Sequence, residues 1–339
     1  MVYVSSWIKH HYPAAFACAL LNSQPMGFYA PAQIVRDAQA HEVEVRPVDV
    51  SHSGWENSLE GSGNRPALRI GLRQIDGFRE DWAEALVAAR AVAGQDIETL
   101  ARRAGLPSAA MRKLADADAF RSMGLDRRQA LWAVRRLPDD ASLPLFAAAD
   151  ARELGAEPDA CLPTMPLGEH VAADYQTLRL SLKAHPMAIL RPLFDAEHIL
   201  TCAQTEAKRN AASVRVAGVV LVRQRPGKGN AIFVTLEDET GITNVVLWAR
   251  MFEQFRREVM AARLMEVEGL VEKSPEGVVH LVARKVIDRS SELTRLSEDH
   301  NTTVQLARAD VVANFQPPRH PPHRHPRDVR ILPGSRDFH

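Results

Sequence analysis

Five runs rich in Val, Ile, Leu, Phe and Thr between residues 214 and 286 constrain the fold of this chain more than any other feature. Gly, Pro, Asn and Asp interrupt the sequence between several of these runs. Apolar runs of this length, bounded by turn residues, predict consecutive short β-strands. The predicted strands cover 214–223, 231–237, 243–248, 264–271 and 278–286, with a helix-like segment at 249–260.

Five short strands with a helix before the fourth are the arrangement of an OB-fold, a small barrel that binds oligonucleotides or oligosaccharides. Arg223, Arg225 and Lys228 lie in or beside the loop RQRPGKGN, which joins the first two predicted strands. Loops at this place border the binding groove of such barrels. Phe233 and Trp248 lie on strands where bases can stack, although aromatic side chains of small barrels are more often core residues.

The region 65–137 carries a second nucleic-acid signal, the pattern Leu72-x-x-Ile75-x-Gly77-Phe78 followed by Arg79. This order of apolar residues around a glycine is typical of a helix-hairpin-helix motif. Gly77 permits a tight turn and leaves room for a phosphate beside the backbone. The unpaired N–H groups of the following helix would then face that phosphate, so the pattern predicts contacts that position the chain on a duplex.

A second copy of the helix-hairpin-helix motif is predicted further along the chain. Gly105 is predicted to end one helix before Pro and Ser open the next, and Gly124 lies in a later turn. Asp126 is predicted as an N-cap, with Arg127 and Arg128 in the first turn. Basic residues oppose the helix dipole there, so an anion is expected beside them. The alternative is a helical bundle whose glycines serve only as C-caps.

Several longer stretches resemble the C-family of bacterial DNA polymerases. The resemblance begins with SSWIKHHYPAAF, which is similar to the end of the fingers region. It continues through LLNSQPMGFYAPAQIVRDAQAHEVEVRPVDV, which is similar to the error-prone branch of that family. The tandem hairpins, the stretch LSLKAHPMAILRP and the ending RILPGSRDFH resemble the same branch, so the resemblance covers nearly the whole chain.

The resemblance implies a fold of the α+β multidomain class. We expect an α-helical end of the fingers region and a tandem helix-hairpin-helix DNA-binding domain, followed by a five-stranded OB-fold β-barrel. A linker with a helical lead-in precedes the barrel, and a tail rich in Pro, His and Arg follows it. The predicted ranges are 1–60 for the end of the fingers region, 61–137 for the tandem hairpins, 138–212 for the linker and lead-in, 213–291 for the barrel and 292–339 for the tail.

The resemblance also implies what chemistry to expect. In the family, carboxylates of the palm, which lies upstream of the fingers, hold two Mg²⁺ ions for nucleotidyl transfer. No carboxylate pair in this chain has the matching context, so we expect no catalytic residue, no cofactor and no polymerisation by this chain alone. Mg²⁺ is expected only with the palm. The chain is expected to be a C-terminal piece, whether it is the product of a truncated gene, a split subunit or an engineered fragment.

Three other motifs invite a functional interpretation. Residues 142–146, SLPLF, are similar to the peptide with which bacterial polymerases bind the sliding clamp, but the usual leading Gln is missing. His320, His323 and His325 lie among prolines that keep the tail extended, so we expect no closed metal site. The acidic run LEDETG is predicted to be a solvated hairpin turn, because adjacent carboxylates on a turn do not converge on one ion.

Composition sets outer limits on these interpretations. The net charge is zero, and residues 61–140 and 213–291 have only small basic excesses, 14 against 11 and 12 against 10. Three distant cysteines fit neither a disulfide framework nor a metal site, and no apolar run approaches the length of a membrane helix. We therefore expect a cytoplasmic protein with no membrane partner.

The predicted function is DNA binding within an error-prone polymerase that acts in damage-induced translesion synthesis. The expected partners are primer–template duplex and single-stranded template, with a sliding clamp and other mutagenesis proteins as further candidates. The alternatives are a stand-alone protein that binds single-stranded DNA through its OB-fold, and a module that binds a clamp or another mutagenesis protein.

Overall fold

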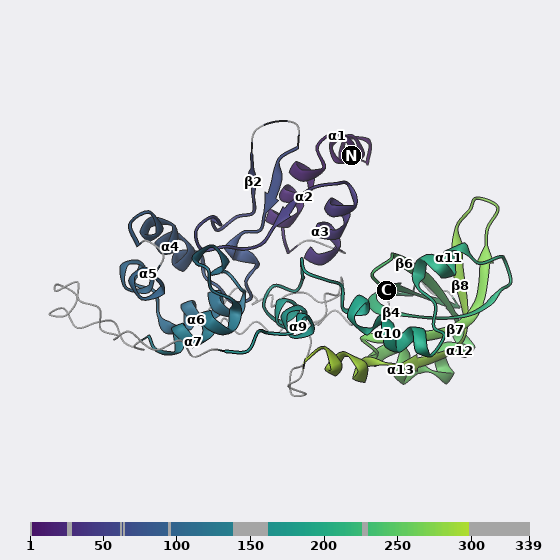
Figure 1. The fold of residues 1–339 in the computed structure, drawn as a ribbon. Helices are drawn as coiled ribbons and strands as arrows, with labels where there is room; N and C mark the ends of the chain where they lie inside the picture. The colour runs from purple at the N-terminus through teal and green to yellow at the C-terminus, as the bar shows by residue number, and fades with distance from the viewer. Residues whose placement is uncertain are drawn as a thin grey trace, which may run out of the picture. The chain divides into compact units, whose positions relative to one another are not determined.

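The computed structural model describes residues 2–25, 29–61, 63, 65–93, 96–137, 162–225 and 230–297. These residues form two compact units. The first takes in the chain up to Lys183 apart from Pro25–Ala30, and the second takes in Pro25–Ala30 and the chain from Ala184 onward. Figure 1 shows helices and a small sheet in the first unit and a barrel in the second.

The first unit combines a three-stranded sheet with helices. Its elements are α1 (Val2–His11), α2 (Pro13–Asn22), α3 (Pro31–Ala40), β1 (Val45–Arg46), β2 (Ser58–Glu60), β3 (Ala67–Arg69), the 3₁₀ turn η1 (Leu72–Gln74), α4 (Glu80–Ala93), α5 (Ile97–Ala104), α6 (Ser108–Asp116), the 3₁₀ turn η2 (Arg121–Met123), α7 (Arg127–Arg135) and α9 (Leu167–Thr177). The central strand β3 runs parallel to β1 and antiparallel to β2. One hydrophobic core extends from α2 through the helices to Leu182.

The predicted boundary between residues 60 and 61 falls inside this sheet, because β2 and β3 pair across it. The segment that leads into η1 is also tied to residues before the boundary. Leu72 N donates to Gly54 O at 2.8 Å, and Gly71 N donates to the Asn57 side-chain oxygen at 3.0 Å. The parts predicted as 1–60 and 61–137 therefore share a sheet, a core and backbone hydrogen bonds.

The second unit is a closed barrel with short helices around it. Its elements are α10 (Pro186–Ala196), α11 (Cys202–Ala207), β4 (Ser213–Gln224), β5 (Ala231–Glu237), β6 (Ile242–Trp248), α12 (Ala249–Gln254), α13 (Arg256–Ala261), β7 (Leu264–Lys273), β8 (Val279–Asp288) and the 3₁₀ segment η3 (Ser290–Leu296). The strand order is β4-β5-β6-β8-β7, closed by pairing of β7 with β4. Only β6 and β8 pair in parallel among the named barrel strands; the other neighbours are antiparallel.

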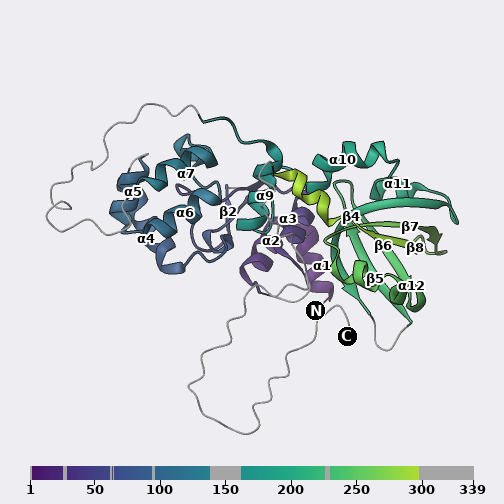
Figure 2. The ribbon, with the colours of Figure 1, turned by 90° about the horizontal axis from the view of Figure 1, so that it is seen from below.

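This barrel confirms the predicted five strands, and the observed strand ends differ from the predicted ends by two residues or fewer. The predicted helix 249–260 is divided into α12 and α13, because Phe255 between them has a backbone conformation outside the helical region. Phe252 and Val259, one from each helix, are buried in the barrel core. The two helices therefore contribute apolar side chains to the same core. Figure 2 shows α12 beside the strands from a second direction.

Gly269 permits a close approach of β7 to β8. The register between these strands shifts at Glu268 and Gly269, as in a β-bulge. A Cβ atom at Gly269 would lie 2.3 Å from the carbonyl oxygen of Val282, which is backbone and does not move aside. The close approach of two strands at the bulge thus explains the glycine.

Candidate nucleic-acid interface

The first hairpin turn lies between η1 and α4, where the sequence pattern predicted it. Leu72, Ile75 and Phe78 are buried and anchor the turn in the core. Gly77 has a φ of +68°, in the left-handed region that favours glycine, and its backbone is exposed. The turn therefore presents backbone to the surface while its apolar neighbours hold it in place.

Cationic side chains from three places in the sequence surround this turn. Lys113, on α6, donates from Nζ to the carbonyl oxygen of Asp76 at 2.8 Å. A Cβ atom at Gly77 would lie 2.9 Å from the same Nζ, so the ammonium group sits against the glycine. Arg179 lies 3.4 Å from the Asp76 carboxylate, and the exposed Arg79 follows the turn directly. Asp76 and Asp81 pair with the two guanidinium groups, so the ammonium group of Lys113 is the cation at this exposed turn that is best suited to a phosphate.

Arg79 is already positioned by its neighbours. Its guanidinium donates to Asp81 at 2.8 Å and lies 5.1 Å from the centre of the Trp82 ring. Lys113 and Arg179 were not among the predicted binding residues. They are far from Gly77 in the sequence, and only the packing of α6 and the segment after α9 brings them to the turn.

The other two predicted turns have the expected backbone. Gly105 ends α5 with a φ of +60°, and Gly124 follows η2 with a φ of +75°. Asp126 forms the N-cap of α7 and takes part in a capping box with Gln129. The local geometry at both glycines is thus as predicted, whereas a contact of either with DNA remains a prediction.

The predicted role of Arg127 as a DNA contact is corrected by the structure. Its side chain is 1% exposed; it donates to the carbonyl oxygen of His170 at 3.0 Å and forms a buried ion pair with Asp174. Arg128 donates to Glu169 at 2.7 Å and to the Pro163 carbonyl oxygen at 2.9 Å. The anion expected at the start of α7 is therefore supplied by α9, because Asp174 and Glu169 both lie on that helix.

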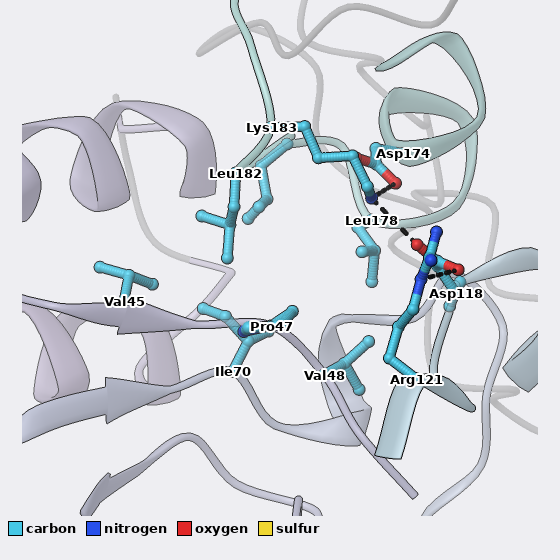
Figure 3. A pocket seen from close by; sticks show the side chains of 12 residues that line it. Val45, Pro47, Val48, Ile70, Asp118, Arg121, Asp174, Leu178, Leu182 and Lys183 are labelled. Carbon is cyan, nitrogen blue, oxygen red and sulfur yellow. Dashed lines mark hydrogen bonds and ion pairs between the residues drawn. The ribbon is translucent and has the colours of Figure 1, made fainter. Parts of the chain in front are cut away.

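Asp174 also belongs to an ionic network on the wall of a cavity (Figure 3). Lys183 Nζ lies 3.0 Å from Asp174 and 3.2 Å from Asp118, and Arg121 donates to Asp118 at 2.9 Å. The cavity has a volume of about 320 Å³, and its other lining side chains are apolar, with Val48 and Ile70 among them. These cations are balanced by carboxylates within the unit, so the cavity adds nothing to a DNA-binding surface.

The barrel offers a second candidate surface on the outside of β5 and β6. Phe233 is half-buried and opposite Val246, and Trp248 is opposite Ala231. These positions face outward, because the alternate residues of β5 are buried in the core, Ile232 among them. Trp248 is 53% exposed, so its ring is available for stacking.

The predicted contact of Arg223 with nucleic acid is also corrected. The side chain is 1% exposed and donates from Nε to the carbonyl oxygen of Val259 at 2.5 Å and from Nη2 to that of Ala262. A cation at the last carbonyl groups of α13 is favoured by the helix dipole. Arg225 follows β4 and is partly exposed, whereas Lys228 lies outside the described residues.

The acidic run LEDETG is not the solvated turn that was predicted. Asp238 is fully buried and accepts hydrogen bonds from the backbone N–H groups of Cys202, Thr240 and Gly241. Arg191, on α10, donates to Asp238 at 3.0 Å and to Glu239 at 2.6 Å. The carboxylates therefore join α10 and α11 to the barrel, and little negative charge is left to repel a phosphate chain.

Among the described residues, Cys202 is a buried free cysteine. Burial raises the pKa of the Cys202 thiol to about 12, so it stays protonated near neutral pH. No group of three or more His, Cys, Asp or Glu residues in this part of the chain is placed to hold a metal ion. None of the helices with assigned positions is long and apolar enough to cross a membrane.

Both candidate surfaces belong to known classes of nucleic-acid-binding domain. Residues 42–130 match the family described as helix-hairpin-helix motif, which confirms the predicted motif. Residues 214–288 match the OB-fold nucleic acid binding domain family, which confirms the predicted barrel class. The chain thus combines two nucleic-acid-binding folds in the predicted order.

The particular relatives are error-prone DNA polymerases, as the sequence resemblance indicated. The whole chain is 57% identical to 33% of the error-prone DNA polymerase of Rhodopseudomonas palustris strain BisB5. It is 52% identical to 30% of the Brucella abortus polymerase and 48% identical to 35% of the Bradyrhizobium diazoefficiens polymerase, again over its full length. The chain spans about a third of these relatives and corresponds to their C-terminal part.

Proposed function

We propose that this chain binds DNA as the C-terminal portion of an error-prone DNA polymerase. The hairpin turn at Gly77 would hold phosphates of the primer–template duplex, with Lys113 supplying charge beside it. The outer face of β5 and β6 would hold single-stranded template by stacking on Trp248. The observation that carries this proposal is the exposed glycine turn with an ammonium group placed against it.

The name of the relatives supports a finer proposal. Proteins called error-prone DNA polymerases are 46–57% identical to the whole chain. We therefore propose that this chain contributes DNA binding to synthesis across damaged template in a DNA-damage response. In this proposal, nucleotidyl transfer and the Mg²⁺ ions that it needs belong to the palm of the polymerase.

Equilibrium binding of the full chain to labelled primer–template DNA tests the proposal. Anisotropy at 50 to 200 mM salt should show a steep fall of affinity with salt, because counterions are released from the phosphates. Lys113→Met should weaken binding and lower the salt slope by about 1. Arg65→Gln is a matched control, since Arg65 is an exposed cation paired only weakly at the surface with Glu42.

Absence of binding at low salt, or binding that does not respond to salt, would refute the proposal. An unchanged salt slope in Lys113→Met would show that Lys113 contacts no phosphate, and the role proposed for the hairpin turn would then be refuted.

A stand-alone single-strand-binding protein is the second candidate, favoured by the exposed Trp248 on an OB barrel. Point substitutions distinguish it better than deletion of 60–140, because that segment shares a core with the preceding residues. In a stand-alone binder, Lys113→Met should leave single-strand affinity unchanged and the chain should not prefer primer–template.

The proposed clamp contact depends on residues 142–146, which lie outside the described residues. Sliding clamp should be pulled down by the full chain, and Leu145→Ala with Phe146→Ala should abolish the capture. If the double variant still captured the clamp, residues 142–146 would not be the clamp-binding segment. Binding to other mutagenesis proteins can be tested by the same pull-down.

A further inference from the structure

Arg79, which follows the hairpin turn, already holds a carboxylate of its own chain. Its Nε and Nη2 atoms donate to the two carboxylate oxygens of Asp81 at 2.8 and 2.5 Å. Arginine binds a phosphate through the same bidentate arrangement of donors. The carboxylate of Asp81 therefore occupies donors that a DNA phosphate beside Gly77 would otherwise use.

This ion pair differs in exposure from the pair that neutralises Arg127. The side chains of Arg127 and Asp174 are 1% and 3% exposed, whereas those of Arg79 and Asp81 are 62% and 56% exposed. An exposed pair is screened by water and contributes little free energy, but a buried pair that is broken leaves an uncompensated charge. A phosphate can therefore displace Asp81 from Arg79 at a small cost, which is not true of Asp174 and Arg127.

A second aspartate stands in the same relation to another cation of the turn. The Asp76 carboxylate, 49% exposed, lies 3.4 Å from the guanidinium group of Arg179. Lys113 differs from both arginines, because its Nζ donates to the backbone carbonyl oxygen of Asp76, which is a neutral group. The charge of Lys113 is thus not offset by the group that it binds, while Arg79 and Arg179 each face a carboxylate.

We infer that Asp81 competes with DNA phosphates for Arg79 and so limits how tightly the hairpin turn holds a duplex. A phosphate that reaches Arg79 has to displace the Asp81 carboxylate or share the guanidinium group with it. Two anions beside one guanidinium group repel each other, so the phosphate gains less from Arg79 than from an unpaired arginine. Asp76 limits the contribution of Arg179 in the same way. This inference rests on the proposed function and names what regulates its strength.

The opposite role for Asp81 is to orient Arg79 toward the phosphate. The structure favours competition, because the Arg79 guanidinium group also lies 5.1 Å from the centre of the Trp82 ring. That contact keeps the arginine beside the turn without help from the carboxylate. The two roles predict opposite signs: loss of a competing carboxylate tightens DNA binding, and loss of an orienting carboxylate weakens it.

The test measures binding of the full chain to labelled primer–template DNA by anisotropy between 50 and 200 mM salt. Asp81→Asn removes the charge and nearly keeps the shape of the side chain. It should tighten binding about two- to fivefold at the lowest salt, as expected when an exposed ion pair no longer competes. The salt slope should become steeper by about 1, because Arg79 then neutralises a phosphate. Asp76→Asn should act in the same direction.

Asp37→Asn is the matched control. Asp37 is also an exposed aspartate of the first unit, but its ion pair, at 2.7 Å, is with Lys9 and not with a cation of the turn. This substitution should leave the affinity and the salt slope nearly unchanged. Thermal unfolding of each variant checks that it is folded.

A double-mutant cycle shows whether Asp81 acts through Arg79. In a chain that carries Arg79→Gln, the further change Asp81→Asn should no longer tighten binding. Weaker or unchanged binding by Asp81→Asn would overturn the inference, and so would an equal gain with and without Arg79. The proposed function is lost only if the wild type itself fails to bind primer–template at low salt, so the two failures are distinguishable.

Discussion

Trp248 provides the most direct test of the barrel surface. It ends β6, lies opposite Ala231 and is 53% exposed. Ile242 begins the same strand, lies on the same outer face and is also 53% exposed. Replacing each residue with Ala therefore removes a half-exposed apolar group from one face, but only Trp248→Ala removes a ring on which a base can stack.

The expected magnitude follows from this difference. Stacking of one base on an aromatic side chain contributes about 1–3 kcal/mol, so Trp248→Ala should raise the Kd for single-stranded DNA about 5- to 150-fold. Ile242→Ala should change Kd by less than about threefold, because it removes no stacking partner. Both substitutions should lower the free energy of unfolding by only about 1 kcal/mol, since half of each side chain is exposed.

The assay is anisotropy of a labelled oligothymidine at several salt concentrations, with thermal unfolding of each variant as a check on folding. The plots of log affinity against log salt for the wild type and Trp248→Ala should be parallel, because no charge is removed. The stacking role would be refuted if Trp248→Ala bound as tightly as the wild type, or if Ile242→Ala lost as much affinity.

Three further predictions concern stability and reactivity. Arg191→Met leaves the buried Asp238 without its cation but with its backbone donors, so the barrel should lose about 2–3 kcal/mol and melt at a lower temperature. Hydrogen bonds from Arg69 lower the pKa of Glu60 to about 2, so Glu60 stabilises the chain above pH about 4.5 and less as pH falls toward 2. Urea unfolding should therefore show a difference between the wild type and Glu60→Gln that shrinks over that range. Burial of the Cys202 thiol should prevent alkylation by iodoacetamide at pH 8 until the chain is unfolded, as peptide mass mapping would show.

The barrel was largely predictable, because each strand is a short apolar run between turn residues. Its ion pairs were not. Arg223 lies on a strand beside the first loop and was therefore predicted to border the binding groove. Only the position of α13 in the folded barrel shows that its guanidinium group donates to backbone carbonyl groups instead. Asp238 resembled a solvated turn residue, yet its partner Arg191 lies 47 positions earlier in the sequence. Contacts between distant residues leave no local periodicity from which they could be inferred.

The hairpin region shows the same limit. The pattern around Gly77 predicted the turn because it is local, with buried Leu72, Ile75 and Phe78. The sequence also correctly indicated that an anion should lie at the start of α7. It could not indicate that the anion is Asp174, 47 residues beyond Arg127, rather than a phosphate.

The hydrogen bonds around η1 limit how this motif can be transferred between proteins by recombination. Leu72 and Gly71 are bonded to the segment 54–57, and Asp76 N donates to Thr177 O at 2.8 Å on the other side of the turn. The turn at Gly77 is thus held from two distant parts of the chain, and its own first helix is only a 3₁₀ turn. The motif would therefore lose its supports if it were transferred by itself. Recombination that moved only the segment after residue 61 into another protein would carry over the glycine pattern without the residues that hold the turn in place.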